Sequence, residues 1–148
     1  MICYTDGACG GNGTANSNGG FGVVVLDDNQ NLIRQYQHFE TGTTNNRQEM
    51  KAILWAMVNY GKKFPLQIYS DSAYAIFAFS VWLDKWIAND WKTSKGRTPE
   101  NIDLIQAFHR LREEGYNCHM HLIKGHNGNK WNEMADQLAT GKIKAMES

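Results

Sequence analysis

The sequence lacks any apolar run that approaches the ~20 residues needed to span a membrane. No charged head followed by an apolar stretch precedes the first strand-like residues, so we find no secretory signal. Cysteine is scarce: Cys3, Cys9 and Cys118 are widely spaced and form no C-x-x-C metal pair. We therefore expect a reduced, cytoplasmic protein that binds no membrane.

An excess of charge of one sign is also lacking, because 15 Lys and Arg residues balance 15 Asp and Glu residues. Nucleic-acid-binding domains are usually basic, so this balance argues against such a partner unless a local positive face exists. Repeats, linkers and low-complexity segments are missing as well. The 148 residues, 42% of them hydrophobic, suffice for one domain with a single core and exclude a disordered chain.

The hydrophobic patterns predict an α/β domain. Strand-like runs at residues 1–6, 21–26 and 32–39 predict an antiparallel meander, and the glycine-rich stretch from 8 to 20 predicts a loop. The later elements are expected in the order helix, strand, one or two helices, helix, strand and helix, at residues 45–60, 65–70, 72–88, 101–114, 116–123 and 131–140.

The helix expected at 45–60 shows one apolar stripe at helical spacing, formed by Met50, Ile53, Leu54, Met57 and Val58. Thr44 or Asn45 is suited to cap its start, and Gly61 is suited to its end. Asn101 is expected to cap the helix that follows it.

Carboxylates recur at the boundaries of these elements. Asp6 ends the first strand, Asp71 ends the strand at 65–70, and Glu49 lies in the first turns of a helix. A meander followed by a helix and another strand implies a crossover, so the strands before Asp6 and Asp71 can be parallel neighbours. Their carboxyl ends then meet at one edge of the sheet, where α/β proteins place their sites.

Clustered carboxylates raise each other's pKa and are tolerated together only when cations neutralise them. Ligands that are all oxygen select hard cations such as Mg²⁺ or Mn²⁺. We therefore predict that Asp6, Glu49, Asp71 and Asp136 hold divalent metal. Two such ions, about 3.5–4 Å apart, suit phosphodiester hydrolysis, in which one activates water and the other stabilises the leaving oxygen.

Some of the candidate residues also have an ordinary explanation. Glu49 could compensate the helix dipole at the surface, and Asp71 in Ser-Asp-Ser could simply cap a helix. His126, between Gly125 and Gly128, could be an exposed loop histidine, or it could relay a proton and help to release product.

The motifs together resemble type 1 ribonuclease H over nearly the whole chain. They are Thr5-Asp6-Gly7, Thr43-Thr-Asn-Asn-Arg47-x-Glu49, Ser70-Asp71-Ser72 and Lys124-Gly-His126-x-Gly-x-x-x-Asn132-Glu133-x-x-Asp136-x-Leu-Ala139. The resemblance implies an α/β ribonuclease H-like fold: a five-stranded mixed sheet, with three antiparallel strands followed by two parallel ones, and helices on both faces. The catalytic domain is expected at residues 1–142, followed by a short tail at 143–148.

The resemblance also implies an activity: hydrolysis of the RNA strand of RNA–DNA hybrids, leaving 3′-hydroxyl and 5′-phosphate ends. It implies two Mg²⁺ ions per active site with substrate, for which Mn²⁺ can substitute, and a monomer without an obligate protein partner. Asp6, Glu49, Asp71 and Asp136 match the metal-binding carboxylates of the family. His126 matches its loop histidine, and Glu133 matches an acidic residue just outside the metal shell.

Substrate contacts follow from the same resemblance. Asn12, Asn45 and Asn46 match residues that reach the minor groove, where the 2′-hydroxyls of an A-like duplex are displayed and amides can donate and accept. Two further groups match contacts to the DNA strand. Thr44 and Asn101 match a pocket that holds a phosphate, and an aromatic channel for the backbone is matched by Tyr74, Trp82 and Trp86. Core packing is an alternative role for these three rings.

Three departures from the family pattern stand out. The loop after Asn12 is long and lacks the family's prolines. The protrusion that many bacterial members make strongly basic reads Lys85-Trp-Ile-Ala-Asn-Asp-Trp91 here, and only four basic residues remain nearby: Lys85, Lys92, Lys95 and Arg97. Fewer released counterions predict weaker binding with a shallower salt dependence than in a basic relative. No separate hybrid-binding domain is expected before Met1.

Three other functions stay open on the sequence. A transposase- or integrase-type nuclease can share these carboxylates on the same fold. The His126 loop and the asparagines at 45 and 46 favour RNA recognition instead. A non-catalytic binding module is disfavoured by the four intact carboxylates. A ribonuclease H domain cut from a reverse transcriptase is disfavoured by a chain that begins immediately before its first strand.

Overall fold

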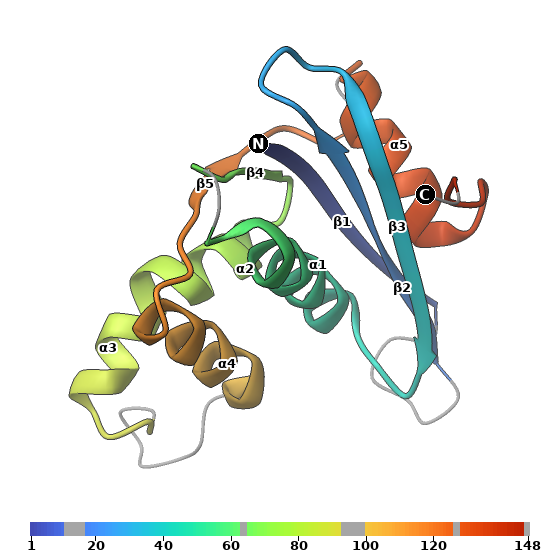
Figure 1. Cartoon of the computed structure of the whole chain (residues 1–148). Coiled ribbons are helices and arrows are strands. Elements are labelled where there is room, and N and C mark those ends of the chain that lie inside the picture. The colour runs from blue at the N-terminus through green and yellow to red at the C-terminus, as the bar shows by residue number, and fades with distance from the viewer. Residues whose placement is uncertain (11–16, 63–64, 93–99, 126–127, 147–148) are drawn as a thin grey trace.

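The computed structural model describes residues 1–10, 17–62, 65–92, 100–125 and 128–146. A five-stranded sheet with the order β3-β2-β1-β4-β5 runs through it (Figure 1). The strands are β1 (Ile2–Gly10), β2 (Asn18–Leu26), β3 (Leu32–Thr41), β4 (Gln67–Ser70) and β5 (His119–Leu122). The first three strands pair antiparallel, β4 pairs parallel with β1, and β5 pairs parallel with β4. This pairing confirms the predicted mixed sheet.

Helices cover both faces of the sheet, as expected (Figure 1). They are α1 (Asn45–Tyr60), α2 (Ala73–Phe77), the π-helical turn η1 (Ala78–Trp82), α3 (Leu83–Ala88), α4 (Ile102–Glu113) and α5 (Lys130–Thr140). Side chains alternate between the two faces of a strand, so β2 contributes side chains to two hydrophobic cores. Val23 and Val25 pack in the core that contains α1, and Val24 packs with Leu138 of α5. Within the described ranges, no helix is long and apolar enough to cross a membrane.

The loop predicted from 8 to 20 is wrong at both ends, because β1 runs on to Gly10 and β2 already begins at Asn18. Glycine usually weakens a strand, but here close packing requires it. A Cβ on Gly20 would lie 2.5 Å from the ring of Phe39, and one on Gly19 would lie 2.4 Å from the methyl group of Thr43. These glycines allow neighbouring elements to approach the strand, and they do not mark a turn.

Helix α1 confirms the predicted range, its cap at Thr44 and its end at Gly61. The expected apolar stripe is only partly right. Met50, Ile53 and Met57 are fully buried, but Val58 is 53% exposed. Two small residues that the stripe did not include, Ala52 and Ala56, are also fully buried.

Asn101 precedes α4 as expected, but its side chain makes no capping hydrogen bond, and its backbone is left-handed, with φ of 59°. Asn101 therefore occupies the predicted cap position, and its carbonyl accepts from the N–H groups of Leu104 and Ile105, but its side chain is engaged elsewhere. Strand β5 is shorter than the predicted 116–123. Tyr116 and Asn117 donate their N–H groups to the carbonyls of Leu111 and Gly61, at the ends of α4 and α1.

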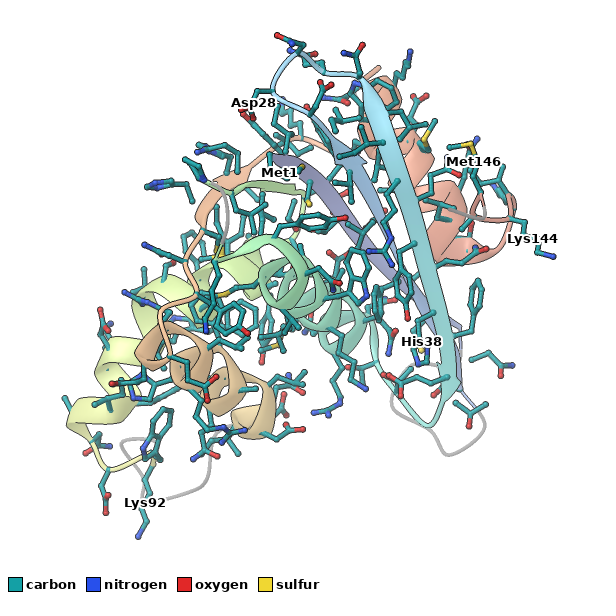
Figure 2. The ribbon with its side chains drawn as sticks, in the orientation of Figure 1. Met1, Asp28, His38, Lys92, Lys144 and Met146 are labelled. Carbon is teal, nitrogen blue, oxygen red and sulfur yellow. The ribbon has the colours of Figure 1, made fainter. Side chains whose placement is uncertain are left out.

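Both ends of the described chain are anchored to the sheet. The ammonium group of Met1 pairs with Asp28 in the β2–β3 turn (Figure 2). The C-terminal segment that carries Lys144 and Met146 lies beside β3 (Figure 2). There Gln37 accepts from the Ala145 N–H at 2.7 Å, and Gln35 accepts from the Met146 N–H at 2.9 Å. The division into a domain at 1–142 and a tail at 143–148 remains a prediction.

Candidate functional site

The register of the parallel strands places the first two carboxylates. Thr5 of β1 pairs with Ser70 of β4, so Asp6 and Asp71 follow at the same edge of the sheet. Glu49 comes from α1, whose start is fixed by Thr44 because its hydroxyl oxygen accepts from the Arg47 N–H at 3.1 Å. Strand pairing and a helix cap therefore direct three side chains to one point.

Asp6, Glu49 and Asp71 each offer a carboxylate oxygen, and these three oxygens lie within 4.8 Å of one another. Asp6 is 4% exposed and Glu49 is 8% exposed. The Gly7 N–H donates to Oδ1 of Asp6 at 2.9 Å and to Oε1 of Glu49 at 3.0 Å. The other oxygen of Glu49, Oε2, is buried without a hydrogen-bond partner in the described part of the chain.

Burial and mutual repulsion both disfavour charge at this cluster. Burial is the main cause that raises the pKa of Asp6 to about 7, with further increases from Asp71 and Asp136. Burial also raises the pKa of Glu49 well above its usual range, and the neighbouring Asp6 adds to the effect. Without a cation, therefore, this pair retains protons at pH values where exposed carboxylates are ionised.

Asp136 borders the same cleft from α5, but its oxygens are not among the three that lie within 4.8 Å. The cleft has a volume of about 360 Å³ and is lined by Asp6, Gly7, Ala8, Asn45, Asn46, Glu49, Asp71, Ser72 and Asp136. Glu133 is exposed in the first turn of α5 and does not line the cleft.

The cluster fits a hard divalent cation. Every ligand that it offers is a carboxylate oxygen, the donor type that Mg²⁺ and Mn²⁺ prefer. The unpartnered Oε2 of Glu49 is the kind of buried acceptor that a bound cation would satisfy. The cluster can thus hold metal beside an open cleft with amide groups on its rim.

The predicted substrate residues fall into three groups. Asn45 and Asn46 line the carboxylate cleft. Tyr74, Trp82 and Trp86 form a continuous row, with ring centroids 5.2 Å apart for the first pair and 5.9 Å for the second. All three also pack against the larger core, so the packing role considered above holds for them.

Thr44 and Asn101 form the third group, and both contact Arg47, a residue to which the sequence assigned no role. Arg47 donates its backbone N–H to Thr44 and its Nη1 to Oδ1 of Asn101 at 3.2 Å. Asn12 and His126 lie outside the described residues.

Sequence reasoning also missed the packing role of two glycines. A Cβ on Gly7 would lie 2.4 Å from the Glu49 nitrogen, and one on Gly125 would lie 2.6 Å from Oδ2 of Asp71. Both glycines belong to quoted motifs, so the signal was present, but the reason for it is a close approach that only coordinates reveal.

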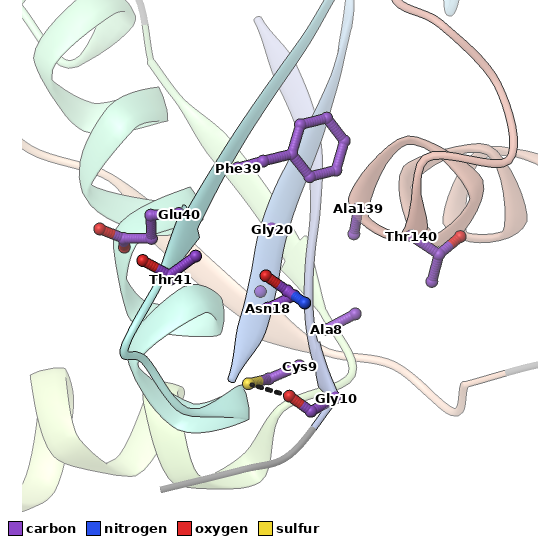
Figure 3. A pocket seen from close by; sticks show the side chains of 11 residues that line it. Ala8, Cys9, Gly10, Asn18, Gly20, Phe39, Glu40, Thr41, Ala139 and Thr140 are labelled. Atoms are coloured by element: carbon purple, nitrogen blue, oxygen red, sulfur yellow. Dashed lines mark hydrogen bonds between the residues drawn. The ribbon is translucent and has the colours of Figure 1, made fainter. Parts of the chain in front are cut away.

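A second, larger cavity of about 530 Å³ adjoins the carboxylate cleft and shares Ala8 with it. Figure 3 shows Phe39 on one side, Cys9 and Gly10 at the end of β1, and Ala139 and Thr140 on α5. It contains none of the predicted site residues.

Comparisons with known proteins agree with this geometry. The RNase H family profile matches residues 1–144. A ribonuclease H from Syntrophomonas wolfei is 38% identical over 148 residues, which cover 99% of this chain and 97% of that protein. The chain is also similar to the crystal structure of LC9-RNase H1, a type 1 RNase H with the type 2 active-site motif, at 25% identity. The TM-score between this chain and LC9-RNase H1 is 0.75, and the match covers 99% of this chain and 76% of that chain.

A crystal structure of LC11-RNase H1 in complex with an RNA/DNA hybrid shares the fold, with a TM-score of 0.69 at 22% identity over 95% of this chain and 94% of that one. The profile match over nearly the whole sequence and the 38% identity decide the assignment. The chain therefore belongs to the type 1 ribonuclease H family and is a nuclease, a hydrolase of phosphodiester bonds.

Proposed function

We propose that this enzyme hydrolyses the RNA strand of RNA–DNA hybrids and leaves 5′-phosphate and 3′-hydroxyl ends. The observation that carries the proposal is the cluster of Asp6, Glu49 and Asp71 within 4.8 Å, in a cleft rimmed by Asn45 and Asn46. The relatives named ribonuclease H and the hybrid bound to LC11-RNase H1 support the same substrate.

We assign the metal to Asp6, Glu49 and Asp71, with Asp136 as a further ligand from α5. When bound there, a pair of Mg²⁺ ions, or Mn²⁺ in their place, would supply activation of the attacking water and charge stabilisation at the leaving 3′ oxygen. The protein's part is to hold its carboxylates in place, and Gly7 contributes by donating to both Asp6 and Glu49.

Recognition of the RNA strand is assigned to the amides of Asn45 and Asn46, which can donate to and accept from 2′-hydroxyls in a minor groove. A DNA strand lacks these hydroxyls, so it would leave the amides without that partner. We further propose that Asn12 contacts the minor groove, that Glu133 lies just outside the metal shell, and that His126 relays a proton or helps to release product.

We assign the contacts with the DNA strand to two other groups of residues. The row of Tyr74, Trp82 and Trp86 offers ring faces and edges to deoxyribose, and Thr44 and Asn101 offer polar groups to a phosphate. We also propose that the enzyme acts as a cytoplasmic monomer. Its three cysteines are free thiols, which supports a reducing compartment.

The test is a gel assay with end-labelled RNA–DNA hybrid, duplex RNA and duplex DNA, in Mg²⁺ and in EDTA, with wild-type and Asp71→Asn proteins. We expect cleavage of RNA in the hybrid only, abolished both by EDTA and by the substitution. Cleavage that survives either treatment would overturn the carboxylate assignment. Cleavage of duplex DNA without cleavage of the hybrid would overturn the substrate.

A further inference from the structure

Asn101 has an unusual conformation for the residue before a helix. Its backbone is left-handed, with φ of 59° and ψ of 23°, and its side chain does not cap α4. Instead Oδ1 accepts from Nη1 of Arg47 at 3.2 Å, and Nδ2 donates to the hydroxyl of Tyr74 at 3.0 Å. Asparagine adopts this region of backbone space more readily than other non-glycine residues do, and here the two side-chain contacts accompany it.

Arg47 is itself held by Asp103, two residues after Asn101. Two parallel hydrogen bonds run from Nη1 to Oδ1 at 2.9 Å and from Nη2 to Oδ2 at 2.7 Å. This bidentate geometry fixes the guanidinium plane, unlike a single ion pair. The bonds to Arg47 also lower the pKa of Asp103, so this carboxylate stays charged at neutral pH.

Both polar residues assigned to the DNA phosphate thus contact one residue, but only Asn101 contacts its side chain. Thr44 accepts from the backbone of Arg47, and Asn101 accepts from its guanidinium group. With its two bonds to Asp103, Arg47 joins the start of α1 to the start of α4.

We propose that Arg47 and Asp103 are positioning residues, which hold the Asn101 amide in place to bind a phosphate of the DNA strand. This inference rests on the proposed function. It has an unexpected consequence for charge. Asp103 is an anion, with a 60% exposed side chain, near a surface that binds phosphate. Its removal should therefore strengthen hybrid binding if net charge alone mattered, and weaken it if positioning mattered.

The experiment compares Asp103→Asn with Glu113→Gln. Both substitutions remove one exposed carboxylate from α4 that contacts a basic side chain, Arg47 in one case and Nε2 of His109, at 3.3 Å, in the other. We expect Asp103→Asn to raise the KM for an RNA–DNA hybrid about five-fold with little change in kcat, the effect of one lost hydrogen bond. Glu113→Gln should leave both constants unchanged. A lower KM in Asp103→Asn would overturn the proposal.

A second comparison tests whether the effect passes through Asn101. In an Asn101→Ala background, Asp103→Asn should cause no further rise in KM, because the amide to be positioned is gone. Arg47→Lys, which keeps the charge but loses the fork, should behave like Asp103→Asn. Additive effects of Asp103→Asn and Asn101→Ala would mean that Asp103 acts by another route.

A readout without catalysis separates this inference from the proposed function. The side-chain amide signals of Asn101 in a ¹⁵N-edited NMR spectrum should shift in Asp103→Asn and not in Glu113→Gln, whatever the substrate is. An unchanged Asn101 signal would refute the positioning role even if the enzyme cleaves hybrids. A shifted signal in an enzyme that does not cleave hybrids would refute only the proposed function.

Discussion

The backbone N–H of Gly7 donates to Oε1 of Glu49 at 3.0 Å, and a Cβ on Gly7 would lie 2.4 Å from the backbone nitrogen of the same glutamate. Strand β1 and helix α1 therefore approach each other as closely as a glycine permits, at the point where the carboxylates meet. The position of Glu49 depends on this contact.

Gly7→Ala should consequently damage both the fold and the site. Helix α1 must move to admit the methyl group, which we expect to lower the free energy of unfolding by about 1–3 kcal/mol. The displaced Glu49 should lower kcat about a hundred-fold, since catalysis is sensitive to shifts of about 1 Å. Chemical denaturation and steady-state kinetics measure the two effects. Gly10→Ala in the same strand is the control, because no atom of the described residues lies within 4 Å of a Cβ at that position. Equal behaviour of the two variants would contradict this account.

The cluster should make stability depend on pH when metal is chelated. Burial raises the pKa of Asp6 from 3.8 to about 7, so the folded protein binds the proton more tightly than the unfolded chain does. The contribution is present below about pH 4 and is lost as pH rises through about 7. In EDTA, the wild type should therefore lose Tm relative to Asp6→Asn over this range. Parallel Tm curves for the two proteins would exclude the raised pKa, and added Mg²⁺ should restore the wild type at pH 8.

Thiol labelling should distinguish the three cysteines. Burial raises the pKa of Cys3 to about 12 and that of Cys118 to about 11, so at pH 8 neither forms much of the reactive thiolate. Cys9 is half-buried beside the cavity shown in Figure 3. We expect a disulfide reagent to label Cys9 first, and Cys9→Ala to remove the fast phase. A fast phase that persists in Cys9→Ala would show that burial does not protect the other two thiols.

The aromatic row carries little positive charge beside it, so added charge should strengthen hybrid binding. Ile87 and Ala88 are exposed in α3, one and two residues beyond Trp86. Ala88→Lys and Ile87→Lys should each tighten binding and steepen the dependence of log Kd on log salt by up to about 0.9 for each new phosphate contact. Anisotropy titrations at several salt concentrations measure this slope. Val58→Lys, about 20 Å along α1 from Asn45, is the control. A slope that changes equally in all three variants would indicate a non-specific effect of charge.

The sequence was sufficient to predict the structure where local rules and topology agree. That Asp6 and Asp71 lie at one edge of the sheet follows from the order of elements, because a crossover makes their strands parallel neighbours. It was insufficient where contacts between residues far apart in the sequence determine the local structure. Gly19 and Gly20 pair within β2, and Thr43 and Phe39 pack too closely against them to admit a side chain. The side chain of Asn101 does not cap α4 but accepts from Arg47, which is far away in the sequence.

The register between β1 and β4 has a practical consequence for protein engineering. Backbone hydrogen bonds across the sheet, with Thr5 opposite Ser70, set the separation of Asp6 and Asp71, and the length of the chain between them does not. Inserting residues in the Asp27–Asn31 turn should leave metal affinity intact. A one-residue deletion within β4 should abolish it, because the strand's side chains would change faces. Metal affinity would then report strand alignment in redesigned versions of this domain.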